Sequence, residues 1–128
     1  MDFSVFAVSA IEMVTEPTDD AIVVFMTASS SEEAGQLADM LVSERLAACV
    51  QILPEMESVY RWQGKIERQR EVLLIAKTVS SKFAELESEV VKLHSYETPE
   101  IVAFPLTNGS RPYLDWVSRS VTKDQTVD

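Results

Sequence analysis

The sequence predicts an α+β domain with a ferredoxin-like β-α-β-β-α-β plait, one antiparallel sheet and an extra C-terminal helix. Short apolar runs of strand character alternate with segments whose apolar residues recur at helical spacing. Two of the expected strands are joined directly by the tight turn Gln63-Gly64-Lys65. The length of 128 residues suits a single domain.

The chain divides into a tail, a domain and a second short tail. We expect residues 1–20 to be a flexible N-terminal tail, 21–122 the domain, and 123–128 a C-terminal tail. The first twenty residues contain five acidic side chains and no basic one, and Pro17 marks a linker. An apolar stretch from Phe3 to Val8 could pack on a neighbour or add to a sheet edge.

The first half of the domain predicts a strand and a helix. The apolar run Ala21–Thr27 has the composition of a buried strand. Ser30 and Glu33 form a capping box at a helix start, because the hydroxyl and the carboxylate each accept a free backbone N–H. This helix ends near Arg45 and presents one apolar face. That face is made of Ala34, Leu37, Ala38, Leu41 and Val42.

A long hairpin is expected next. Residues 47–53 and 59–62 form one of its strands and residues 66–78 the other. Pro54 cannot donate to a strand ladder, so it marks an edge, a bulge or a bend. The second strand alternates with charges at first and then becomes continuously apolar, so the tip should project beyond the sheet centre.

The rest of the chain predicts helix, strand, helix. Ser80 or Ser81 would cap a helix with Phe83, Leu86, Val90 and Leu93 on its inner face. Residues 96–99 break it, and 101–106 form the fourth strand. After the turn at Asn108-Gly109, Ser110 would cap a final helix. Right-handed crossovers place both long helices on one sheet face, so the other face needs cover, for example by self-association.

Charge and cysteine content exclude several classes of function. A net charge of −10 argues against nucleic-acid binding and against attraction to an anionic membrane. The single Cys49 cannot form an intrachain disulfide, which favours a reducing compartment. Met1-Asp2 offers no basic region for a secretory signal, since the first basic residue is Arg45. We therefore expect a cytoplasmic protein with no membrane and no nucleic-acid partner.

Three residues could carry chemistry, and each has a purely structural alternative. Cys49 is a soft-metal ligand or a small buried apolar residue. His94, the only histidine, is a metal ligand or a histidine favoured at a helix C-terminus. Lys77 binds an anion, pairs with a carboxylate, or reaches solvent at the end of its strand.

The runs Glu44–Pro54, Ser58–Glu67 and His94–Ile101 together resemble the signatures of the CutA family, the divalent-cation tolerance proteins. The resemblance covers residues 22 to about 121. It implies a homotrimer whose sheets face inward, with a role in tolerance of divalent metal ions such as copper.

The resemblance also implies site residues. Tyr60, Trp62, Glu67 and Tyr96 match positions around clefts between subunits, and Lys77-Thr78 matches a recurrent pair of the family. Glu97 belongs to the second signature and joins this ligand-binding cleft. The metal, Cu²⁺ or another divalent cation, would be held at His94 with Cys49 nearby. Two family ligand positions differ here, because Leu93 replaces a His and Met26 a Cys.

Two functions follow from these expectations. The first is a trimeric cytoplasmic protein that serves divalent metal tolerance by binding and not as an enzyme. The alternative is a sensor or adaptor similar to the PII signalling proteins, which would bind a small anionic metabolite or a partner protein between subunits. A stable scaffold without a functional cleft is the third reading.

Overall fold

The structure, a computed structural model, describes residues 19–122 and has the predicted order of elements. Its strands form one sheet in the order β3-β4-β2-β5, in which every pair is antiparallel. The predicted α+β fold class is confirmed. The elements are β2 (Ala21–Ala28), α2 (Ser31–Ser43), β3 (Cys49–Trp62), β4 (Lys65–Val79), the 3-10 turn η1 (Ser80–Lys82), α3 (Phe83–Leu93), β5 (Ile101–Pro105) and α4 (Arg111–Ser120). Within these residues no helix is both long and apolar enough to cross a bilayer.

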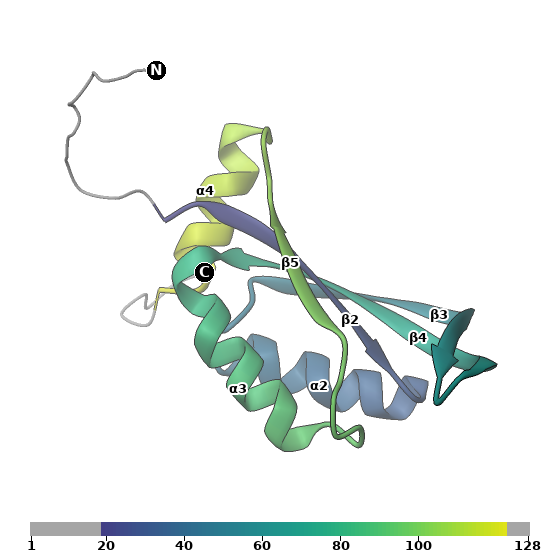
Figure 1. Ribbon diagram of the computed structural model, residues 1–128. Coiled ribbons are helices and arrows are strands. Elements are labelled where there is room, and N and C mark those ends of the chain that lie inside the picture. The colour runs from purple at the N-terminus through teal and green to yellow at the C-terminus, as the bar shows by residue number, and fades with distance from the viewer. Residues whose placement is uncertain (1–18, 123–128) are drawn as a thin grey trace.

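The main core lies between the sheet and helices α2 and α3, which cover the same face of the sheet (Figure 1). Alternate residues of β2 and β4 point toward these helices, as the period of two in a strand requires. The largest fully buried side chains of this core on the sheet and the two helices are Val24, Met26, Leu37, Leu41, Leu74, Leu86 and Val90. The predicted placement of both long helices on one face is confirmed.

Within residues 19–122, the opposite face of the sheet is covered only at one end. There, Val117 and Val121, on and just after α4, pack with Ala48 and Val79. The remainder is an apolar surface, which we call the open face, made of Phe25, Leu73, Ile75, Val102 and Phe104. Phe25 and Phe104 meet edge to face with ring centroids 5.1 Å apart. Phe104 is 44% exposed and Val102 is 49% exposed, so the described chain leaves much of this surface in water.

The hairpin of β3 and β4 projects past the rest of the sheet (Figure 1). Strand β2 ends at Ala28 opposite Val72, so among the described strands residues 65–71 of β4 pair only with β3. A bulge between Leu53 and Met56 sets two residues of β3 against Val72, and Glu55 within it has φ 28°. The predicted turn is also present, with φ 80° at Gly64.

Helix starts agree with the sequence in two cases out of three. Ser30 caps α2 as predicted, since its hydroxyl accepts the N–H of Glu33. Ser110 is the N-cap of α4, without a side-chain bond. The predicted cap of the second helix by Ser80 or Ser81 is wrong, because these residues form η1 and α3 begins at Phe83.

The carboxylate of Asp19 takes the place of that cap. It accepts the backbone N–H of Ser81 at 3.0 Å and the hydroxyls of Ser80 and Ser81. Burial alone would raise the pKa of Asp19, but the hydrogen bonds from Ser81 outweigh it and lower the pKa. Asp19 and Asp20, expected in the tail, therefore belong to the folded unit, whereas the apolar stretch from Phe3 to Val8 lies outside the described residues.

Candidate ligand-binding site at the base of the hairpin

Polar side chains gather where the hairpin leaves the sheet. The segment that follows α3, residues 94–96, lies beside β4 at the place where β2 has ended. It brings the ring of Tyr96 against the outer part of β4. This junction joins the loops after β2 and α3 to the hairpin.

Glu71 is the centre of the junction. It is only 8% exposed, and its two carboxylate oxygens each accept one hydroxyl. Ser58 donates to Oε1 at 2.6 Å, and Tyr96 donates to Oε2 at 2.8 Å. A buried carboxylate needs such partners, because burying an ion without them costs on the order of several kcal/mol.

The network continues from Tyr96 to the hairpin surface. The amide nitrogen of Gln69 donates to the Tyr96 oxygen at 2.8 Å, and the Tyr60 hydroxyl donates to the Gln69 oxygen at 2.8 Å. Burial raises the pKa of the Tyr96 hydroxyl, and the adjacent Glu71 carboxylate raises it further. The Tyr96 hydroxyl therefore keeps its proton throughout the physiological pH range and donates a hydrogen bond to Glu71.

His94 is buried and uses both ring nitrogens. The N–H of Tyr96 donates to Nδ1 at 3.0 Å, so this nitrogen carries a lone pair. Nε2 lies 2.7 Å from the carbonyl oxygen of Thr27 and must therefore be the protonated nitrogen. A metal could bind His94 only by displacing one of these two bonds.

Glu33 secures the same segment from the helix side. Its Oε1 accepts the N–H and hydroxyl of Ser29, and its Oε2 accepts the N–H of Ser95 at 2.7 Å. The same Oε2 lies 3.6 Å from Nδ1 of His94. Burial would raise the pKa of Glu33, but the bonds from Ser29 and Ser95 prevail and lower it to about 2.

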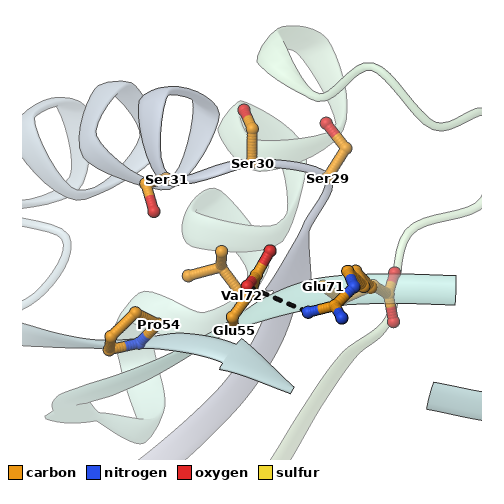
Figure 2. A pocket seen from close by; sticks show the side chains of 8 residues that line it. Ser29, Ser30, Ser31, Pro54, Glu55, Glu71 and Val72 are labelled. Atoms are coloured by element: carbon orange, nitrogen blue, oxygen red, sulfur yellow. Dashed lines mark hydrogen bonds and ion pairs between the residues drawn. The ribbon is translucent and has the colours of Figure 1, made fainter. Parts of the chain in front are cut away.

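A cavity of about 300 Å³ lies next to the junction (Figure 2). Ser29, Ser30 and Ser31 line one side, where β2 turns into α2, and Pro54 and Glu55 of the bulge line the other. Glu55 is joined to Arg70 at 3.1 Å, the dashed contact in Figure 2. The hydroxyls and this ion pair form the polar part of the lining, and Pro54 and Val72 contribute to the apolar part.

Two of the predicted residues lie at the other end of the sheet. Lys77 pairs in register with Cys49, and its ammonium donates to Oε1 of Gln51 at 2.7 Å. The Cys49 sulfur is 3.5 Å from the Tyr113 hydroxyl of α4. Burial and this contact raise the pKa of Tyr113 to about 12. Lys77 is ten residues from Glu67 along β4, a distance of about 33 Å in a strand.

The structure thus brings together some predicted residues and separates others. Tyr60 pairs with Glu67 across the hairpin, and Gln69 links Tyr60 to Tyr96. Trp62, 60% exposed, lies one step further toward the tip, and Glu97 is exposed in the bend after α3. His94 and Cys49 lie against different parts of the sheet. Residues 19–122 contain no group of three or more His, Cys, Asp or Glu side chains placed to hold a metal.

Sequence reasoning missed three residues of the junction: Gln69, Glu71 and, beyond its capping role, Glu33. In the sequence, Glu71 is one of several charges that alternate along the first half of its strand. Its neighbour Val72 begins the continuous apolar run, and a carboxylate next to such a run is a signal of burial. Gln69 carries no signal of this kind, because its role depends on Tyr96.

Comparison with known proteins gives one consistent result. The model of the family described as CutA1 divalent ion tolerance protein matches residues 22–120. The divalent-cation tolerance protein CutA of Thermus thermophilus is 50% identical over 95 residues, which are 74% of this chain and 92% of that protein. The chloroplastic protein CutA of Arabidopsis thaliana is 45% identical over 103 residues, 80% of this chain. This chain spans 57% of the plant protein, little more than half its length.

Solved structures agree with the sequence comparisons. The divalent cation tolerance protein Cut A1 of Thermus thermophilus superposes with a TM-score of 0.77 at 47% identity, covering 78% of this chain and 97% of that one. CutA1 of Oryza sativa gives a TM-score of 0.80 at 41% identity, with 84% and 98% covered. The protein from Archaeoglobus fulgidus described as a periplasmic divalent cation tolerance protein gives 0.78 at 43% identity, with 80% and 99% covered.

Proposed function

The chain belongs to the CutA1 divalent ion tolerance family, and from that premise we propose that it serves divalent-cation tolerance as a homotrimer. The protein would bind a cation such as Cu²⁺ between subunits without turning over a substrate. The observation that carries this proposal is the open face of the sheet together with the polar junction beside it.

The open face supports self-association. Its apolar side chains lie on the side of the sheet away from α2 and α3, and in the part of the chain that the structure describes only α4 covers one end of this side. Contiguous apolar patches on soluble proteins mark interaction surfaces, because their exposure to water is unfavourable. Copies of the same chain are the partner proposed here, since a closed assembly would bury this face in every subunit.

The separation of the predicted cleft residues supports a cleft between subunits. Within one chain, Lys77 and Glu67 stand about 33 Å apart on β4, by the rise of a strand. A cleft that contains both must therefore draw them from two copies. The projecting hairpin, which carries Tyr60, Trp62 and Glu67 beyond the sheet, has the reach to contact a neighbour.

Native mass spectrometry on protein prepared without a metal-affinity tag tests this proposal. We expect a trimer that takes up Cu²⁺ in fixed stoichiometry. Glu67→Gln should reduce the uptake, whereas Glu57→Gln, the same change of charge on the other side of the hairpin, should not. His94→Ala tests the predicted histidine ligand directly. A monomer would exclude the trimer, and uptake equal in all variants would exclude a metal site at these residues.

One observation favours the alternative of a PII-like sensor or adaptor. Both nitrogens of His94 are engaged in hydrogen bonds, which leaves a junction of hydroxyls, an amide and carboxylates suited to an organic ligand. An increase of the melting temperature with small anionic metabolites, but not with Cu²⁺, would support this function, because a ligand stabilises the state that binds it.

We also propose that the protein acts in the cytoplasm. The single thiol of Cys49 suits a reducing compartment. Relatives described as chloroplastic or periplasmic make the location worth measuring. Cell fractionation with antibody detection should find the protein in the cytosolic fraction, and recovery in another compartment would refute this assignment.

A further inference from the structure

We infer that Glu71 sets the direction of a chain of hydrogen bonds that leaves the Tyr60 oxygen as an acceptor. The proposed cleft beside Tyr60, Trp62 and Glu67, called the hairpin cleft, would therefore select ligands that bear positive charge or N–H donors. This inference deepens the proposed function and depends on it, because it assumes that the cleft beside Tyr60 binds a ligand. The class of ligand follows from which group donates and which accepts in each hydrogen bond of the chain.

The direction begins at Glu71. A carboxylate can only accept hydrogen bonds. Its two oxygens receive the hydroxyls of Ser58 at 2.6 Å and Tyr96 at 2.8 Å. Glu71 is 8% exposed, so water has little access to compete for these positions. The Tyr96 proton is therefore committed to Glu71.

Each further step is determined by the one before it. Since Tyr96 has spent its only proton, its oxygen can only accept, and the group 2.8 Å away must be the amide nitrogen of Gln69. The amide oxygen of Gln69 then faces Tyr60 at 2.8 Å and accepts its hydroxyl proton. The orientation of Gln69 thus follows from chemistry and not only from the placement of its atoms.

The outer end of the chain presents acceptors. Tyr60 is 40% exposed, and with its proton directed at Gln69 its oxygen offers only lone pairs to a ligand. Glu67, its register partner on the same face of the hairpin, is another acceptor. The next pair toward the tip adds the exposed ring of Trp62, which attracts cations over its face.

Two charges in the surroundings bear on this selection. Lys65 pairs with Trp62 and carries the positive charge nearest in register, so it weakens the attraction for cations. The net charge of −10 attracts cations to the whole surface. A test must therefore separate the hydrogen-bond chain from general electrostatics.

Hexaamminecobalt(III) is a suitable probe, because it offers only N–H donors and does not exchange its ammonia for protein ligands. We expect it to shift the indole N–H resonance of Trp62 in NMR titrations of the intact protein, whereas sulfate should not. Tyr60→Phe should weaken binding about fivefold, because one hydrogen bond is lost. Glu67→Gln should weaken it by a similar factor, because the ligand loses an adjacent negative charge. Glu57→Gln should change it less than about twofold, because Glu57 lies on the other face, paired with Arg68.

A pair of variants at Glu71 isolates the direction of the chain from charge. Glu71→Ala and Glu71→Gln lose the same charge, but Gln keeps an oxygen that can accept the Tyr96 proton. We expect Glu71→Ala to weaken hexaamminecobalt binding about fivefold and Glu71→Gln to retain it within about twofold. Tyr96→Phe also allows the amide group of Gln69 to rotate, so it should weaken hexaamminecobalt binding as much as Glu71→Ala does. It replaces Glu71→Ala in the test if that variant does not fold.

Equal losses in Glu71→Ala and Glu71→Gln would overturn the inference, as would equal losses in Glu67→Gln and Glu57→Gln, a preference for sulfate, or no binding of the probe by the wild type. The mass spectrometry with Cu²⁺ is independent of this outcome. A wild type that binds the probe as expected but takes up no Cu²⁺ would refute the metal-binding proposal and leave the ligand class intact.

Discussion

Strand β4 passes through two environments, and its halves can be compared directly because both pair with β3. In the inner half, residues 72–79, alternate side chains are buried against α2 and α3. In the outer half, residues 65–71, most side chains are exposed and only Glu71 is buried. Apolar burial holds the first half, whereas cross-strand pairs and the polar junction hold the second.

The inner half of β4 therefore provides stability, and the outer half positions the side chains proposed to bind a ligand. The inner half contributes transfer free energy, about 25 cal/mol for each Å² of apolar surface buried. The outer half contributes orientation, because hydrogen bonds fix the side chains of Tyr60 and Tyr96. Substitutions in the outer half should therefore change binding before they change folding.

The sharpest test of this contrast replaces one apolar residue in each half. Leu74→Ala leaves a cavity at a fully buried site and should lower the free energy of unfolding by about 3 kcal/mol. Ile66, which is 66% exposed, should tolerate the same truncation at a cost below about 0.5 kcal/mol. Urea denaturation measures both values, and similar losses would contradict the division of the strand.

Acid should weaken the hydrogen bonds by which Glu33 holds Ser95 and the segment after α3 beside the outer half. The pKa of Glu33 is lowered from 4.5 to about 2 in the folded protein. Its contribution is therefore complete above pH 4.5, the unfolded value, and is lost as the pH falls toward 2. We expect a loss of about 2 kcal/mol over this range. Urea midpoints of wild type and Glu33→Gln between about pH 7 and 2.5 measure it, and identical slopes would exclude this role of Glu33.

Removing one hydroxyl should loosen the outer half alone. Tyr96→Phe leaves Glu71 and Gln69 each without one partner and should cost about 1.5 kcal/mol. Amide hydrogen exchange should accelerate in residues 65–71 and stay unchanged in residues 72–79. Tyr113→Phe is the matched control, since that hydroxyl contacts Cys49 at the other end of the sheet. Uniform acceleration along β4 would show that the two halves open together.

The smallest effect is expected from an ion pair on the hairpin surface. Arg68 and Glu57 lie 3.1 Å apart, but their side chains are 65% and 55% exposed. Water and salt screen such a pair, so Arg68→Ala should change the free energy of unfolding by less than about 0.5 kcal/mol. A loss above about 1 kcal/mol in urea denaturation would show that surface charges, and not only the junction, hold the outer half.

Local patterns were enough to predict the elements and the fold class. The capping box of Ser30 and Glu33 and the turn at Gly64 depend only on neighbours in sequence, and both are present. The start of the second helix is different, because no neighbouring serine caps it and Asp19, 62 residues away, instead binds the 3-10 turn that precedes it. Gln69 and Glu71 were missed for the same reason, because both contact Tyr96, which lies more than 20 residues away in the sequence, and local spacing does not show such contacts.

The bulge between Leu53 and Met56 determines which side chains of the projecting hairpin lie on each of its two faces. With one extra residue in β3, the even-numbered Tyr60 and Trp62 share a face with the odd-numbered Glu67 and Gln69. A straight ladder of the same sequence would turn both aromatic rings to the opposite side. Deleting Glu55, by contrast, would remove the irregularity and keep both rings where they are. In the evolution of this hairpin, loss of a residue should thus be tolerated at position 55 and harmful beside the rings, near the tip.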